Sequence, residues 1–106
     1  MKFLRLSIAL AFSASVASGQ SFDSMMRATE LGTVLAAEDL CGLSFNQGAV
    51  ADWIDNNTDP SDMGFPGTLQ MMVEGSKFQN SEMTGSVLTA HCRSVERTAR
   101  HFGFIE

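Results

Sequence analysis

The chain contains only two cysteines, Cys41 and Cys92, and this pair limits its possible folds more than any other feature of the sequence. The two lie 51 positions apart (92 − 41). In a chain exported to an oxidising compartment, two cysteines are most simply joined in one disulfide. Closing a loop of this length would stabilise the fold by about 4 kcal/mol, because it restricts the unfolded chain. We therefore predict a structural Cys41–Cys92 bridge.

The first nineteen residues, MKFLRLSIALAFSASVASG, have the layout of a secretory signal peptide. Two basic residues precede an apolar stretch of about ten residues, and small residues follow it. Cleavage after Gly19 would leave Gln20 first, and cleavage after Ala17 would also be acceptable. We predict a signal peptide at 1–19, a single helical domain at 20–106, and a periplasmic or secreted location.

The predicted mature domain is small and acidic. Its 87 residues (106 − 19) are near the size at which a hydrophobic core alone gives only a few kcal/mol. Without the two basic residues of the signal peptide, twelve acidic residues stand against five basic ones, a net charge of −7. Nucleic acid is excluded as a partner because phosphate binding needs a basic surface. No apolar run after residue 20 approaches the 18 or so residues of a membrane-spanning helix, so no transmembrane segment is expected after signal cleavage.

Apolar side chains recur at helical spacing in the first half of the domain. The segment 22–41 lacks proline and predicts one helix, which Gly42 would end in a left-handed cap. Glu38 falls within the apolar arc of this helix, where no partner for it is evident from the sequence. The arc otherwise consists of Leu31, Val34, Leu35 and Cys41.

Two further helices are predicted on either side of a polar loop. Ser44 and Gln47 have the spacing of a capping box and would start a short helix. Its apolar side would carry Ala49, Val50, Trp53 and Ile54. The stretch DNNTDPSD favours turns, and Phe65 and Pro66 begin the next helical pattern. That pattern places together Phe65, Leu69, Met72, Val73 and Ser76.

The segment 81–102 has the clearest amphipathic pattern in the chain. Its apolar face consists of Leu88, Cys92, Val95, Ala99 and Phe102. Cys41 would therefore end the first helix and Cys92 would lie inside the last, so that the bridge pins the two terminal helices together. No alternating β pattern is present, and we predict an all-α fold, a small bundle of about four helices tied by one disulfide.

His91 and Cys92 resemble a catalytic dyad only in the written sequence. Neighbouring residues of a helix point about 100° apart, and an oxidised cysteine has no thiolate. His91 and His101 are ten residues apart, about 15 Å along a helix, which is too far to chelate one ion. No phosphate-binding loop, serine elbow or complete calcium loop is present either. We predict no catalytic residue, no metal site, no cofactor and no enzymatic activity.

Three arginines, Arg93, Arg97 and Arg100, form a stripe on the face opposite the apolar side of the last helix. Residues 20–76 carry a net charge of −8, with nine acids and one base, whereas residues 77–106 carry +1. The stripe is either a solvated face with a Glu96–Arg100 pair, or a docking surface for an acidic partner or anionic lipid. We take the three arginines as candidate partner-binding residues.

Methionine-rich composition suggests one alternative function. Thioethers and imidazoles suit Cu(I), so an exported copper-binding protein is a possible interpretation. The methionines that would remain after export are Met25, Met26, Met63, Met71, Met72 and Met83. Adjacent methionines on a helix point to different faces, however, and methionine also fills irregular cores.

The phrases LCGLSFNQGAVADWI, DMGFPGTLQMM and LTAHCRSVERTARHFGFI resemble small exported single-disulfide helical proteins of proteobacteria, a group of unassigned function. The layout is also similar to the HdeA-type periplasmic acid-stress chaperones. That resemblance implies a chaperone activated when the carboxylates are protonated below about pH 3, which would take the net charge from −7 toward about +7. Our leading hypothesis is a non-enzymatic periplasmic protein that binds an unidentified protein partner, with the chaperone and the copper-binding protein as alternatives.

Overall fold

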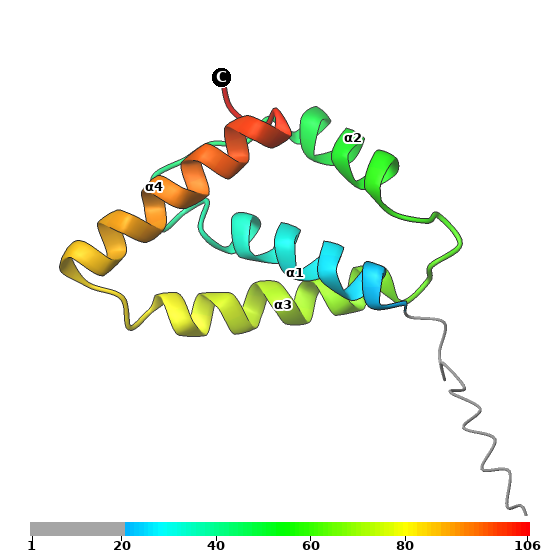
Figure 1. Cartoon of the computed structure of the whole chain (residues 1–106), viewed down its shortest axis with the longest axis horizontal. Helices are drawn as coiled ribbons and strands as arrows, with labels where there is room; N and C mark the ends of the chain where they lie inside the picture. The colour runs from blue at the N-terminus through cyan, green and yellow to red at the C-terminus, as the bar shows by residue number, and fades with distance from the viewer. Residues whose placement is uncertain (1–20) are drawn as a thin grey trace, which may run out of the picture.

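The computed structural model describes residues 21–106, which form four α-helices and no strand (Figure 1). The helices are α1 (Phe22–Ala36), α2 (Gln47–Asn57), α3 (Phe65–Asn80) and α4 (Gly85–Phe102). The predicted all-α bundle of four helices is therefore confirmed. The predicted signal peptide at 1–19 and the predicted first mature residue, Gln20, lie outside the described residues.

Helices α1 and α3 lie side by side and run in the same direction (Figure 1). The approach is close at Gly32 of α1, whose missing side chain leaves room for Met72 of α3. Helix α4 returns from the end of α3 toward the start of α2 (Figure 1). The loop after α2 then leads back to the start of α3, beside the start of α1, where the Ser24 hydroxyl donates a hydrogen bond to the carboxylate of Asp62.

The core lies where these helices meet the segment that follows α4. Leu31 of α1 and Phe104 are its largest fully buried side chains. Phe104 packs against Phe45 and Phe102, with ring centroids 5.5 and 5.4 Å apart. The Phe104 carbonyl also accepts a hydrogen bond of 2.9 Å from the N–H of Asn46, which holds the C-terminal segment against the start of α2. The predicted inward face of α4 is confirmed at Val95 and Ala99, which are buried in this core, whereas Leu88 is half-buried and lies outside it.

The Cys41–Cys92 disulfide is present, with the two Cα atoms 5.4 Å apart. The prediction that Cys41 ends a helix is wrong, because α1 ends at Ala36 and Cys41 lies in the turns that follow. The bridge thus joins the segment after α1 to the middle of α4. Gly42 has a positive φ of 64°, and the bonds from the N–H of Leu43 to the Glu38 carbonyl, at 2.8 Å, and from the N–H of Gly42 to the Asp39 carbonyl, at 3.2 Å, form the predicted left-handed cap, which closes the turn after α1.

Hydrogen bonds to Glu38 favour a turn over a longer helix after Ala36. The Glu38 carboxylate turns back to accept a hydrogen bond of 2.7 Å from the N–H of Phe45, and its carbonyl accepts one of 2.8 Å from Leu43. These bonds satisfy backbone groups of the connection between α1 and α2, which would otherwise lack partners. Glu38, the acidic residue within the predicted apolar arc, therefore holds this loop in place by hydrogen bonds.

The starts of α2 and α4 also differ from the prediction. The Ser44–Gln47 capping box is wrong, since Asn46 is the cap: its side-chain oxygen accepts a hydrogen bond of 3.0 Å from Ala49. Asparagine is a favoured cap, and this one stands immediately before the first helical residue. Ser81 does not start α4, because its hydroxyl donates a hydrogen bond of 2.6 Å to the carbonyl of Phe78 at the end of α3.

Two aspartates of the loop between α2 and α3 accept hydrogen bonds from other residues of the same loop. The Asp59 carboxylate accepts hydrogen bonds from the hydroxyl and the N–H of Ser61, at 2.7 and 2.9 Å. These bonds favour the charged form and lower the pKa of Asp59 below its ordinary value of 3.8, the side-chain bond being the larger cause. Asp62 accepts a hydrogen bond of 3.2 Å from the N–H of Gly64. Both aspartates therefore organise this loop.

The Asp59–Ser61 bond predicts a pH-dependent contribution to stability. A carboxyl whose pKa is lowered on folding stabilises the fold above its unfolded pKa, and the contribution is lost as the pH falls through the folded pKa. We expect Ser61→Ala to raise the pKa of Asp59 toward 3.8, measured by carboxyl chemical shifts against pH. The variant should unfold at lower denaturant concentration than the wild type at pH 6, and this difference should shrink at pH 2. An unchanged Asp59 titration in the variant would contradict the assigned cause.

Candidate functional site

The His91–Cys92 pair has no free thiol. Both cysteines of the chain are bonded to each other, so neither can act as a nucleophile or a metal ligand. His91 is half-buried, and its Nε2 atom is buried without a hydrogen-bond partner in the described part of the chain. His101 is exposed at the end of α4. Among residues 21–106, no group of three or more His, Cys, Asp and Glu side chains could hold a metal ion.

The three predicted arginines lie together on the exposed outer surface of α4, but they differ in their partners. Glu96 accepts hydrogen bonds from Arg93 at 3.5 Å and from Arg100 at 2.9 Å. Arg100 also donates to the carbonyl of Glu106, at 3.1 Å. Arg97 makes no hydrogen bond or ion pair to any residue in the described range. The predicted Glu96–Arg100 pair is confirmed, and Arg97 is the guanidinium of the stripe that is available to a partner.

A hollow of about 390 Å³ includes one arginine of this stripe, and we call it the disulfide hollow. It is lined by Leu40, Cys41, Leu88, Thr89, Cys92, Arg93 and Glu96. The lining thus combines apolar groups, the bridge and the two leucines, with the charged side chains of Arg93 and Glu96. Arg93 keeps 71% of its side chain exposed, so its charge is little shielded by the protein. Helical spacing placed Cys92 and Arg93 on different faces of the helix, and nothing in the sequence indicated that both would line one hollow.

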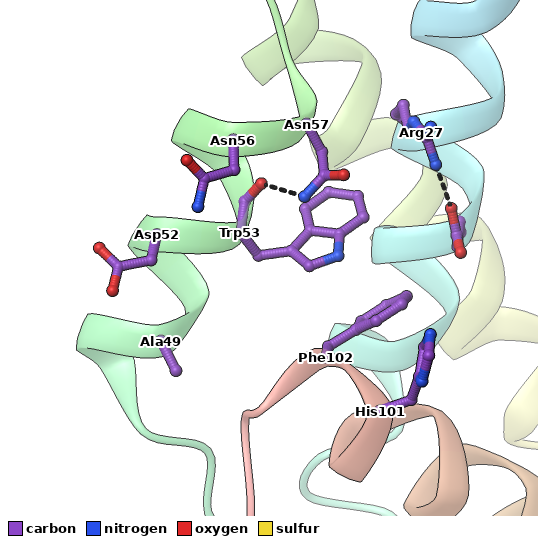
Figure 2. Close-up of a pocket in the computed structure, with 9 residues that line it drawn as sticks. Arg27, Ala49, Asp52, Trp53, Asn56, Asn57, His101 and Phe102 are labelled. Atoms are coloured by element: carbon purple, nitrogen blue, oxygen red, sulfur yellow. Dashed lines mark hydrogen bonds and ion pairs between the residues drawn. The ribbon is translucent and has the colours of Figure 1, made fainter.

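A second concave surface lies between α1, α2 and α4, and we call it the three-helix cleft (Figure 2). It holds about 460 Å³ and is lined by Arg27, Glu30, Ala49, Asp52, Trp53, Asn56, Asn57, His101 and Phe102. In Figure 2 the Trp53 indole projects from α2 toward α1, above the ring of Phe102. The two ring centroids are 5.1 Å apart and the rings are tilted by 40°.

The polar groups of the three-helix cleft are only partly paired. Arg27 bonds to Glu30 along α1, at 3.3 Å, and the Asn57 side chain donates to the Trp53 carbonyl at 2.7 Å (Figure 2). Asp52 and Asn56 are exposed and make no hydrogen bond to another described residue. Trp53 itself is only 8% exposed, so the accessible lining of the cleft is mainly polar, with free acceptors on Asp52 and Asn56.

Sequence reasoning missed the three-helix cleft. It placed Trp53 and Phe102 on the apolar faces of their helices. The polar side chains that line the cleft with them come from α1, α2 and α4. Their convergence depends on tertiary packing, for which a single sequence carries no spacing signal.

Large apolar side chains are also exposed outside these two surfaces. Phe22, Met25 and Met26 line a hollow of about 640 Å³ on the first turns of α1. On α3, Met71 and Phe78 are both more than 70% exposed. The methionines considered for copper are thus distributed over α1, the loop before α3, α3 itself and the turn after it.

No protein-family model matches the chain, and no curated protein and no solved structure matches it either. None of the helices described in residues 21–106 is both long and apolar enough to span a membrane.

Proposed function

We propose that this chain is an exported, non-enzymatic domain that binds an acidic surface of another protein through the outer face of α4. The observation that carries the proposal is the disulfide hollow, whose lining combines Leu40, Leu88 and the bridge with Arg93, one helical turn before the unpaired Arg97. The signal-like N-terminus and the paired cysteines support export.

The hollow and the stripe together have the composition of a protein interface. Interfaces commonly combine an apolar centre with a polar rim, and arginine is enriched among the residues that contribute most to binding. A partner side chain seated between Leu40 and Leu88 would bury apolar surface, while Arg97 would pair with a carboxylate at the edge. The disulfide fixes one wall of the hollow, so little conformational entropy would be lost on binding.

The charge distribution supports an acidic partner. The domain as a whole is acidic, and four of its five basic residues lie in the segment 77–106. An acidic protein would be repelled by most of the surface and attracted to the outer face of α4, which would orient its approach.

A matched pair of double variants tests the proposal. Arg93→Gln with Arg97→Gln removes two charges from the stripe, whereas Arg27→Gln with Lys77→Gln removes two charges elsewhere and gives the same net charge. Partners captured from a periplasmic extract by the wild type should be captured about fivefold more weakly by the stripe variant, and unchanged by the control. Arg100 is left intact because it also bonds Glu106. Equal capture by both double variants would overturn the assignment of the surface.

A further inference from the structure

We propose that the outer face of α3 binds a second copy of this chain, so that the α3 helices of the two copies pack antiparallel about a two-fold axis. The outer face of α3 is the surface formed by Met71, Glu74 and Phe78, with Lys77 at its edge. It is separate from the outer face of α4, and a dimer formed through it does not depend on the protein-binding function proposed above.

Helix α3 contacts the rest of the domain with one side only. Among the described helices, α1 is the one that packs along it (Figure 1). Leu69 and Met72 of α3 lie against the core. With 3.6 residues per turn, Met71, Glu74 and Phe78 point within about 60° of one another, on the side opposite Leu69. The outer face of α3 is therefore directed away from the core along the length of the helix.

Two large apolar side chains of this face are exposed. Phe78 is 74% exposed and Met71 is 72% exposed. Exposed apolar side chains that gather on one face mark interaction sites, because burying them removes apolar surface from water. Glu74 and Lys77 are the only charged residues of α3, so the helix is neutral while the predicted mature domain carries −7. A second copy of this acidic chain would therefore meet little repulsion at α3.

The apolar spacing of the face is complementary to itself. Met71 and Phe78 are seven residues apart, about 10.5 Å along the helix. When two α3 helices run antiparallel with the axis midway between these residues, Met71 of each copy meets Phe78 of the other. A methionine sulfur beside an aromatic ring is a favourable contact. The same arrangement therefore covers all four exposed side chains.

The charges of the face are complementary in the same arrangement. Glu74 and Lys77 both lie toward one side of the face, and Met71 and Phe78 lie toward the other. A two-fold axis perpendicular to the helices reverses their direction but keeps each side against its like. It places Glu74 of one copy within about 3 Å, along the helix, of Lys77 of the other. Neither residue makes an ion pair within the described part of the chain, so both are available for this contact.

Other occupants fit this face less well. A parallel pair of α3 helices would bring the apolar side of one copy against the charged side of the other. An anionic membrane would repel the acidic domain, and Glu74 stands between the two apolar side chains that would have to enter it. An antiparallel second copy is the occupant that satisfies both the apolar and the charged residues.

The oligomeric state of the purified protein tests the proposal. The interface is one helix wide, well below the size of most stable interfaces, so we expect a dissociation constant in roughly the micromolar range. Sedimentation equilibrium over concentrations from about 1 µM to 1 mM should show a monomer that becomes a dimer. Phe78→Ser should raise the dissociation constant about tenfold or more, because two phenylalanines are lost from each dimer. Phe22→Ser is the matched control, since Phe22 is 78% exposed but lies on α1, and it should change the constant less than twofold.

Charge reversal tests the antiparallel arrangement itself. Glu74→Lys and Lys77→Glu should each weaken the dimer about fivefold or more, and the double variant should return to within about twofold of the wild type because both ion pairs form again. Asp55→Lys makes the same change of net charge on α2 and should not weaken the dimer. A monomer at every concentration, equal losses in Phe78→Ser and Phe22→Ser, or a double variant as weak as the single ones would each overturn the proposal. Far-ultraviolet circular dichroism checks that every variant keeps its helices.

Discussion

Replacing Cys41 and Cys92 together by alanine is expected to lower the free energy of unfolding by about 4 kcal/mol. The bridge closes a loop with a sequence separation of 51, and chain entropy alone gives this magnitude. A domain of this size is stabilised by only about 5 to 10 kcal/mol in total, so the bridge supplies a large share. We expect the melting temperature to fall by about 15 to 30 °C.

Thermal and urea unfolding of the oxidised wild type, the reduced wild type and the double alanine variant would measure this effect. Reduction should destabilise the wild type to about the level of the variant, whereas the variant itself should not respond to reductant. A melting temperature within about 5 °C of the oxidised wild type would show that the bridge adds little to the packing of α1 and α4.

The helices could be predicted from the sequence because their apolar periodicity reflects the core they form. The inward positions Leu31, Val34, Val95 and Ala99 are all buried as the helical spacing indicated. Local hydrogen bonds, by contrast, decided where helices begin and end. The Asn46 side chain caps the start of α2, and the Glu38 side chain bonds to the backbone of the connection after α1. A pattern of apolar residues contains no information about such bonds.

The two candidate surfaces differ in how far the sequence could reveal them. The arginine stripe lies on one helix, so spacing alone places Arg93, Arg97 and Arg100 on one face. The three-helix cleft requires α1, α2 and α4 to meet, and this depends on the C-terminal segment folding back so that Phe104 packs against Phe45. Phe45 and Phe104 are visibly apolar in the sequence, but their contact could not be predicted from it. A site on one element can therefore be predicted here, whereas a site between elements needed the fold.

Gly32 and Gly75 are expected to respond to alanine substitution with opposite signs. A Cβ atom at Gly32 of α1 would lie 2.8 Å from the Cβ of Met72 and 3.3 Å from the backbone of Met72 and Val73. Because backbone atoms of α3 cannot move independently, the two helices would have to separate. The cost of such overpacking is about 1 to 3 kcal/mol, from which the better helix propensity of alanine subtracts at most about 1 kcal/mol. We therefore expect Gly32→Ala to lower the free energy of unfolding by up to about 2 kcal/mol.

Gly75 provides the control within α3, since nothing lies within 4 Å of a Cβ atom added there. Gly75→Ala should raise the free energy of unfolding by about 0.5 to 1 kcal/mol, because alanine loses less backbone entropy on folding than glycine. Urea unfolding of both variants, followed by circular dichroism, would measure the two shifts. If Gly32→Ala stabilised the domain as Gly75→Ala does, α1 and α3 would not be in close contact at Met72, and the parallel packing of these two helices would be wrong.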